Sequence, residues 1–321
     1  MKIFITGIIP EIGIKALENA GVEVLQWKGK RELSPQELIE HCKQADALLV
    51  AGFTKIDSAF LNACKHLKVI ALLTVGYDHV DVAEANRLKI PIGNTPGVLS
   101  GATADTAFLL MLAASRKAFY MHQRIIKGEW GFFEPVANLG IELNGKTLGI
   151  YGLGKIGHEM AKKCAGAYHM KIIYHNRHHH PQAEKELNAE LVSFDDLLQR
   201  SDVISVHVSL SDETKGKFDK VAFAKMKPSA IFVNTARGTI HNEADLINAL
   251  ENGTIWGAGL DVTNPEPMAA DNPLLNMPSV AILPHIGSAT VETRDAMTQI
   301  AVANSIAGLN GKPIPYPVNH K

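Results

Sequence analysis

The chain has 321 residues, of which 46% are hydrophobic and 20% are charged, which is typical of a globular protein with enough apolar material for two domain cores. The formal net charge of −1 offers no basic surface for nucleic acid, and no apolar stretch is long enough to cross a membrane. The three cysteines, Cys42, Cys64 and Cys164, form no CxxC pair, so we expect no disulfide and no metal site, and a cytoplasmic location.

The first hundred residues alternate between strand-like and helix-like segments. Strands are predicted at Lys2–Ile5, Val22–Gln26, Ala47–Val50 and Val69–Leu73. Helices are predicted at Glu11–Ala20, after a capping box at Ser34-Pro35-Gln36-Glu37, and after the capping residues Asp57 and Asp81. Because a strand begins at once, we expect no secretory signal peptide. The alternation predicts an α/β domain whose parallel sheet is covered on both faces.

From Ser100 to Lys127 the pattern changes to one long helix that is apolar almost all round. A helix of this kind is buried on several sides. It could lie between two domains, between two subunits, or both.

A second alternation begins at Thr147, and its six predicted strands are Thr147–Tyr151, Lys171–His175, Val203–Val208, Ala230–Asn234, Gly257–Val262 and Val280–Leu283. The last predicted helix, from Ser288 to about Gly308, would return to the first domain. We therefore expect two Rossmann-like, doubly wound domains, 1–99 plus 287–321 and 100–286. The cleft between them is the default active site.

A glycine-rich turn, Gly152-Leu153-Gly154-Lys155-Ile156-Gly157, joins the strand Thr147–Tyr151 to a predicted helix. In dinucleotide-binding proteins the first glycine makes the tight turn, the second lets the backbone approach the pyrophosphate, and the third lets the helix pack on the strand. The free N–H groups at the helix start favour the phosphates. The motif and its flanking elements predict a dinucleotide site.

About 20 residues further on, NAD-binding sites place an acidic residue on the ribose 2′-hydroxyl. Here the strand ends in Asn176 and Arg177, with no carboxylate. An arginine at this place accommodates the 2′-phosphate of NADP, so we expect NADP(H) to be preferred and NAD(H) to be possible. The alternative is that Arg177 is an ordinary solvated loop residue. We interpret the neighbouring His178-His179-His180 as a solvated turn rather than a metal site.

Three residues that could do chemistry follow consecutive predicted strands. Arg237 follows Ala230–Asn234, and the N–H donors of its planar guanidinium group can bind a carboxylate or a 2-oxo acid through two parallel hydrogen bonds. Glu266 is held between two prolines, and His285 follows the last strand. Because the carboxyl ends of parallel strands share one sheet edge, a carboxylate beside His285 could orient the ring and favour its protonated form, which could then donate to a substrate oxygen.

Taken together, several motifs resemble those of the D-isomer-specific 2-hydroxyacid dehydrogenase family over essentially the whole chain. They are Thr74-Val75-Gly76-Tyr77-Asp78, Thr95–Leu99 leading to Ala102–Asp105, Gly152–Gly157, Asn234–Gly238, Asp261-Val262 with Pro265-Glu266-Pro267, and Pro284–Gly287.

The resemblance implies that Arg237 binds the carboxylate and carbonyl of the substrate, that Glu266 pairs with His285, and that His285 is the acid–base. It implies that Val75 and Gly76 bind the carboxylate through backbone N–H groups. The remaining implied positions lie near the cofactor, with Asp261 at the nicotinamide end; they are Thr103, Val208, Thr214, Ala236, Asp261 and Gly287.

Within the family, the chain is most similar to glyoxylate/hydroxypyruvate reductases and 2-ketogluconate reductases, which implies NADPH as cofactor and a small 2-oxo acid as substrate. Ser209 departs from the proline usual in the family, and we expect it to loosen a cofactor-side loop. The resemblance also implies a homodimer through 100–127, and Phe133 either reaches the neighbouring subunit's active site or is an aromatic residue at a domain interface.

Two alternatives to this function stay open. The substrate could be 2-ketogluconate or another 2-oxo acid. The chain could also resemble those members of this fold family that sense dinucleotides and bind peptides without turnover.

Overall fold

The computed structural model describes residues 1–319 and divides them into two compact units. The first comprises Met1–Leu99 together with the chain from Ala289 onward, and the second comprises Ser100–Ser288. The last two residues of the predicted segment 287–321 lie outside the described residues. No helix in the described chain is long and apolar enough to span a membrane.

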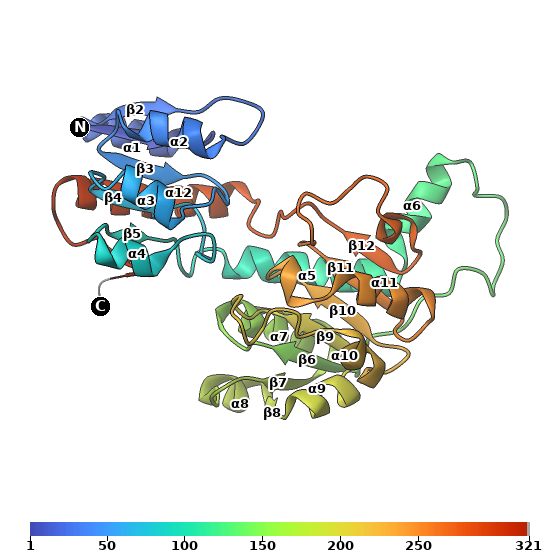
Figure 1. The fold of residues 1–321 in the computed structure, drawn as a ribbon. Helices are drawn as coiled ribbons and strands as arrows, with labels where there is room; N and C mark the ends of the chain where they lie inside the picture. The colour runs from blue at the N-terminus through green and yellow to red at the C-terminus, as the bar shows by residue number, and fades with distance from the viewer. Residues whose placement is uncertain (320–321) are drawn as a thin grey trace. The chain divides into compact units, whose positions relative to one another are not determined.

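The first unit is built on a five-stranded parallel sheet of order β2-β1-β3-β4-β5 (Figure 1). Its strands are β1 Lys2–Ile5, β2 Glu23–Gln26, β3 Ala47–Val50, β4 Val69–Leu72 and β5 Ile92–Gly93. Four of them match predicted strands to within one residue at each end. The fifth, β5, was not predicted because its two residues are too few to show a periodic pattern.

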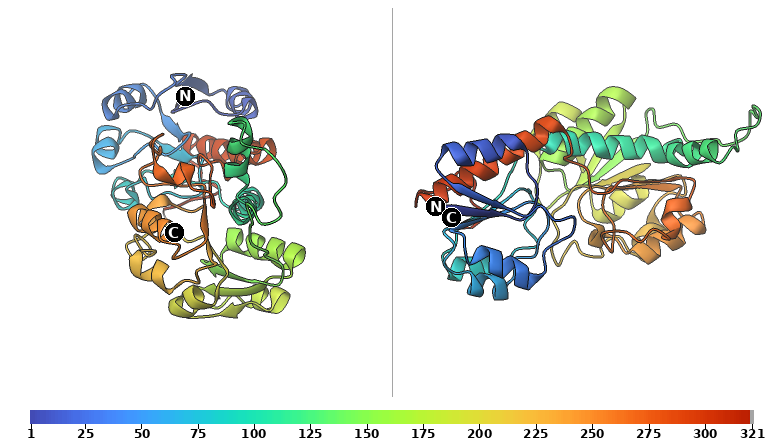
Figure 2. Two further views of the ribbon diagram at one scale, coloured as in Figure 1. Left: turned by 90° about the vertical axis from the view of Figure 1, so that its right-hand side faces the viewer. Right: turned by 90° about the horizontal axis from the view of Figure 1, so that it is seen from above.

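Helices of the first unit begin where the predicted caps place them. Ser34 forms a capping box with Glu37, and Asp57 and Asp81 each accept a hydrogen bond from a backbone N–H of the first helical turn. The helices are α1 Glu11–Asn19, α2 Pro35–Cys42, α3 Ser58–Ala63, α4 Val82–Arg87 and α12 Val291–Leu309. Helix α12 runs beside α1 and packs on β3 and β4 (Figure 2).

The second unit is built on a seven-stranded parallel sheet of order β12-β11-β10-β9-β6-β7-β8 (Figure 1). Its strands are β6 Thr147–Tyr151, β7 Lys171–His175, β8 Glu190–Leu191, β9 Val203–Val206, β10 Ile231–Asn234, β11 Gly257–Leu260 and β12 Val280–Ile282. The prediction of six strands was one short because β8 has two residues. Strand β6 pairs with β7 on one side and β9 on the other, so the strand order reverses beside β6.

Both faces of the second sheet are covered, which confirms a doubly wound arrangement. One core contains Met111 of α5 and Met160 of α7, and the other contains Leu197 of α9, Phe223 of α10 and Leu246 of α11. These and the remaining helices are α5 Ser100–Ser115, α6 Ala118–Ile126, α7 Lys155–Tyr168, α8 Pro181–Leu187, α9 Phe194–Arg200, α10 Lys220–Lys225 and α11 Glu243–Glu251. The three cysteines are buried and free.

The prediction of one helix over Ser100–Lys127 was wrong, because the chain forms two helices, α5 and α6. The break lies at Lys117, whose φ of 54° is left-handed and cannot continue a right-handed helix. A segment distant along the chain supports this break, since the backbone N–H of Ile141 donates to the carbonyl of Ser115 at 3.0 Å.

Candidate active site

The glycine turn after β6 touches the chain that follows β9. Gly152 has a φ of 96°, and a Cβ at this position would lie 2.7 Å from the backbone nitrogen of Val208. Only glycine fits both conditions. The turn therefore closes against Val208 beside β6, where the strand order reverses and doubly wound sheets bind their ligands.

Helix α7 begins at this turn with uncapped backbone donors. Gly154 is its N-cap and is exposed, as is Lys155, and no side chain caps the first turn. Such a helix start attracts anions because its first N–H groups have no partner inside the helix.

The side chain of Asn176, just past β7, fastens the glycine turn. Its Oδ1 accepts from the backbone N–H of Leu153 at 2.7 Å, and its Nδ2 donates to the carbonyl of Leu153 at 3.2 Å. Arg177 is exposed. The place of a ribose-binding acid is thus taken by an amide that holds the turn, followed by an exposed cation.

Two of the three histidines after Arg177 make contacts with helix α8. His180 caps α8 by accepting from the backbone N–H of Ala183, and His179 lies 2.7 Å from a carboxylate oxygen of Glu184. The side chain of His179 is nevertheless 71% exposed, so these contacts lie at the surface. Among the described residues, no group of three or more histidine, cysteine or acidic side chains could hold a metal ion.

The loop that begins at Ser209 is held by one hydroxyl group. The Oγ1 of Thr214 donates to the carbonyl of Ser209 at 2.9 Å and accepts from the backbone N–H of Ser211 at 2.8 Å. These bonds hold the loop from Ser209 to Thr214.

The turn after β10 carries Arg237, which is partly buried. Its backbone is fixed by Asn234, whose Oδ1 accepts from the N–H of Ala236 and whose Nδ2 donates to the carbonyl of Arg237, both at 2.9 Å. A Cβ at Gly238 would lie 1.9 Å from the carbonyl oxygen of Thr263. The absence of a side chain there lets the Arg237 turn lie directly against the loop that leads to Glu266.

Glu266 and His285 form a close pair. The Nδ1 of His285 lies 2.5 Å from Oε1 of Glu266, and both side chains are partly exposed. Burial would raise the pKa of Glu266, but the hydrogen bond to His285 and the charges of His285 and Arg237 lower it to a greater extent. Glu266 is therefore a carboxylate near neutral pH, and Arg237 is close enough for its charge to act on it.

The backbone around His285 is held by Asp261, a buried residue just past β11. The N–H of His285 donates to the carbonyl of Asp261, and the N–H groups of Ile286 and Gly287 donate to its two carboxylate oxygens at 2.8 Å each. Burial raises the pKa of this carboxyl, although the two backbone bonds oppose that effect. The clamp holds His285 at a φ of 54°, a conformation unfavourable for most residues. Thr103 lies beside Gly287.

In the first unit, the segment after β4 holds Val75 and Gly76. The carbonyl of Val75 accepts from Asn94 and that of Gly76 accepts from the hydroxyl of Thr74, both at 2.8 Å. Within residues 1–319, no hydrogen bond engages the N–H of Val75 or of Gly76. The loop is fixed through its carbonyl groups, which leaves these two donors for a ligand.

The predicted residues of the second unit thus lie along one sheet edge. Strands β10, β11 and β12 are neighbours, and their carboxyl ends carry Arg237, Asp261 and His285. The glycine turn follows β6 at the same edge of the sheet, and β9 is the one strand that separates β6 from β10. An acid–base pair, a guanidinium group and a dinucleotide turn on one edge suit hydride transfer to a carbonyl compound.

A sequence model described as the D-isomer specific 2-hydroxyacid dehydrogenase, NAD binding domain, matches residues 108–287. The glyoxylate reductase of Thermococcus litoralis is 43% identical over 99% of this chain and 96% of its own length. The chain belongs to the D-isomer-specific 2-hydroxyacid dehydrogenase family. It is therefore an oxidoreductase whose fold binds a nicotinamide dinucleotide and whose family acts on small 2-oxo and 2-hydroxy acids.

Solved structures of similar proteins agree with the fold. A Thermus thermophilus protein superimposes with a TM-score of 0.93 at 38% identity, covering 99% of this chain and 100% of its own. The NADPH-dependent glyoxylate/hydroxypyruvate reductase of Sinorhizobium meliloti, solved with NADP and malonate, superimposes with a TM-score of 0.86 at 30% identity, covering 99% of this chain and 96% of its own.

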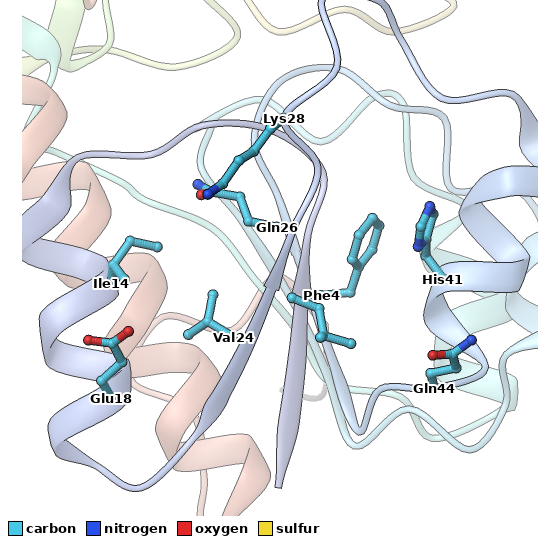
Figure 3. Close-up of a pocket in the computed structure, with 9 residues that line it drawn as sticks. Phe4, Ile14, Glu18, Val24, Gln26, Lys28, His41 and Gln44 are labelled. Carbon is cyan, nitrogen blue, oxygen red and sulfur yellow. The ribbon is translucent and has the colours of Figure 1, made fainter.

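A separate hollow of about 460 Å³ lies in the first unit beside the edge strand β2 (Figure 3). Figure 3 shows Ile14 and Glu18 on one side of the strand and His41 and Gln44 on the other. None of the predicted site residues lines it.

The sequence motifs found the catalytic candidates but missed the residues that hold them. Asp261 was expected to contact nicotinamide, but the sequence did not predict that its carboxylate holds the backbone next to His285. The part that Asn234 plays in fixing Arg237 was also missed. A polar residue that ends an otherwise apolar, buried strand is the signal that could have found it.

Proposed function

We propose that this dehydrogenase reduces a small 2-oxo acid, glyoxylate or hydroxypyruvate, to the D-2-hydroxy acid with NADPH. The observation that carries the proposal is the 2.5 Å contact between Glu266 and His285 at the sheet edge that also carries Arg237. The names of the relatives support the substrate class.

The residues of the glycine turn fit a dinucleotide. Gly152 fits only without a side chain, Asn176 fixes Leu153, and the uncapped N–H groups of the first helical turn, from Lys155 onward, suit the pyrophosphate. The residues expected to line the rest of the cofactor site are Thr103, Val208, Thr214, Ala236, Asp261 and Gly287. When bound, the nicotinamide supplies the hydride for the reduction.

His285 supplies the proton. Because Glu266 is a carboxylate, it accepts from Nδ1–H of His285, which leaves Nε2 to carry the proton that the substrate oxygen receives. In the oxidative direction the neutral imidazole accepts the proton from the hydroxyl group. Glu266 stabilises the imidazolium and orients its ring in both directions.

Arg237 binds the carboxylate and carbonyl oxygens of the substrate, because a guanidinium group can donate to both at once. The N–H groups of Val75 and Gly76 add donors for the carboxylate, which is consistent with their lack of partners in the first unit.

Preference for NADPH rests on Arg177 and on the absence of an acid at the end of β7. Asn176 is occupied by Leu153, so it does not replace the missing carboxylate, and the exposed Arg177 is available to a 2′-phosphate. That the Sinorhizobium meliloti relative was solved with NADP supports the same cofactor.

We also propose that the chain forms a homodimer in the cytoplasm through the 100–127 region. Apolar side chains are exposed on α5, on α6 and in the segment that follows: Leu109, Ile125, Ile126, Trp130, Phe132, Phe133, Val136 and Leu139. Exposed apolar side chains gathered in one segment of the chain are typical of an interface. Phe133, 86% exposed, is the residue of this segment that we propose to reach the active site of the partner subunit.

The test is oxidation of NADPH and NADH by the purified protein with glyoxylate, hydroxypyruvate, pyruvate and 2-ketogluconate in parallel. Fast NADPH oxidation with the two- and three-carbon acids supports the proposal. Faster turnover of 2-ketogluconate moves the substrate to a sugar acid. Tight cofactor binding with no turnover of any acid favours a dinucleotide-sensing, peptide-binding role instead.

A further inference from the structure

His241 is a buried histidine with no part in the chemistry described so far. It is 1% exposed and lies just after the short 3-10 turn Gly238–Ile240 that follows Arg237. Its backbone is anchored from two sides, by a bridge to Phe218 and by a bond from its N–H to the carbonyl of Gly238. The backbone of His241 is therefore fixed close to the Arg237 turn.

The ring nitrogen Nδ1 of His241 lies 3.1 Å from Nδ2 of Asn234. The orientation of this amide follows from its other partners, since Oδ1 must accept from the N–H of Ala236 and Nδ2 must donate to the carbonyl of Arg237. The second hydrogen of Nδ2 therefore points to His241, and Nδ1 must accept it. This bond requires the neutral ring with its proton on Nε2.

Burial favours the same form. The pKa of His241 is lowered to about 4 because the ring is desolvated, so the ring is neutral at physiological pH. The Nε2–H of this tautomer has no hydrogen-bond partner within residues 1–319. A buried N–H group without a partner destabilises the fold, and an aliphatic side chain at position 241 would avoid this cost. An aliphatic side chain, however, could not accept the hydrogen bond from the amide of Asn234.

We propose that His241 is a positioning residue for substrate binding: by accepting from Asn234, it fixes the amide that holds the backbone of Ala236 and Arg237. Asn234 is 0% exposed, so water cannot replace a lost partner. Without the acceptor on His241, one hydrogen of the Asn234 amide therefore has no partner. The amide can then rotate and release the carbonyl of Arg237. This inference rests on the proposed role of Arg237 as the substrate-binding residue.

The test compares His241→Leu, His241→Asn and Arg237→Gln in steady-state reduction of glyoxylate or hydroxypyruvate. Leucine removes the acceptor, whereas asparagine can place an oxygen close to where Nδ1 lies. We expect His241→Leu to raise the KM for the oxo acid about tenfold, which corresponds to about 1.4 kcal/mol. Its kcat and its Kd for NADPH should stay within about twofold, and His241→Asn should return KM to within about threefold of the unmodified protein.

Thermal unfolding of each variant checks that it is folded. An unchanged KM in folded His241→Leu, while Arg237→Gln raises KM, overturns the role of His241 and leaves the proposed function intact. Equal impairment in His241→Leu and His241→Asn also overturns it, because loss of the acceptor would then not be the cause. An unchanged KM in Arg237→Gln instead refutes the role of Arg237, and the inference falls with it.

Discussion

The carboxyl edge of the seven-stranded sheet holds its functional residues in two different ways, one around β10–β12 and the other around β6 and β7. Around β10–β12, buried side chains hold the backbone of the reactive residues, as Asp261 does for His285 and Asn234 does for Arg237. Around β6 and β7, the glycine turn is fixed by its own shape and by Asn176, but the charged residues beside it, Lys155 and Arg177, are exposed. The groups that we propose to meet a reacting atom are preorganised, whereas the groups that we propose to meet a phosphate remain solvated.

This contrast predicts that changes around β10–β12 act on turnover or on the KM for the substrate, and that changes around β6 and β7 act on cofactor affinity. The largest expected effect is at His285. Asparagine tolerates the left-handed conformation of this position but cannot transfer a proton at neutral pH. We expect His285→Asn to lower kcat by about 10²- to 10⁴-fold. Titration should give an NADPH Kd close to that of the unmodified protein, and an unchanged kcat would refute the acid–base role.

The second effect tests the clamp. Asp261→Asn replaces one acceptor of a backbone N–H by a donor, so one of the bonds from Ile286 and Gly287 is lost. A buried donor without its acceptor costs about 1–3 kcal/mol, and we expect kcat to fall by about tenfold to a hundredfold. Asp271→Asn, in the exposed part of the same loop, is the matched control. If both variants retain full turnover, the clamp does not position His285.

The third effect lies at the glycine turn. Gly152→Ala places a methyl group against Val208 at a φ that disfavours any side chain, at a cost of about 1–3 kcal/mol. We expect the Kd for NADPH to rise about tenfold and the melting temperature to fall. In the control, Gly166→Ala in helix α7, the new Cβ meets open space and helix propensity improves. Equal cofactor affinity in the two variants would contradict this account.

The smallest effect distinguishes the two dinucleotides. Arg177→Gln removes an exposed charge, and we expect the KM for NADPH to rise about tenfold while that for NADH hardly changes. Arg200→Gln, at another exposed arginine of the same unit, should change neither value. A parallel rise for both cofactors would mean that Arg177 does not meet the 2′-phosphate.

Much of this fold could be predicted because its signals are local. Apolar runs marked ten of the twelve strands, and capping residues such as Ser34 and Asp57 placed helix starts. The two missed strands have two residues each and exist through pairing with a neighbour. The break at Lys117 carries no glycine or proline, and a contact from Ile141, distant along the chain, supports it.

The features of the site also divide into those that the sequence predicts and those that it does not. Arg237, Glu266 and His285 stand in short motifs at strand ends, so residue type and position identify them as candidates. The bonds that hold them join residues far apart along the chain, as between Asp261 and Gly287, and no local pattern encodes such a pairing. Asn234 and His241 are only seven residues apart, but their contact depends on the geometry of the turn between them, which the amino-acid sequence alone does not reveal.

The clamp at Asp261 also concerns how this enzyme can vary. The backbone on both sides of His285 is tied to the end of β11, the neighbouring strand, and between the two the chain needs to place only Glu266 beside the histidine. The stretch Ala269–Asp271 in this part of the chain is exposed. We therefore expect this surface loop to accept insertions and deletions without moving His285, the proposed proton donor, so that the loop can diversify while the reaction stays the same.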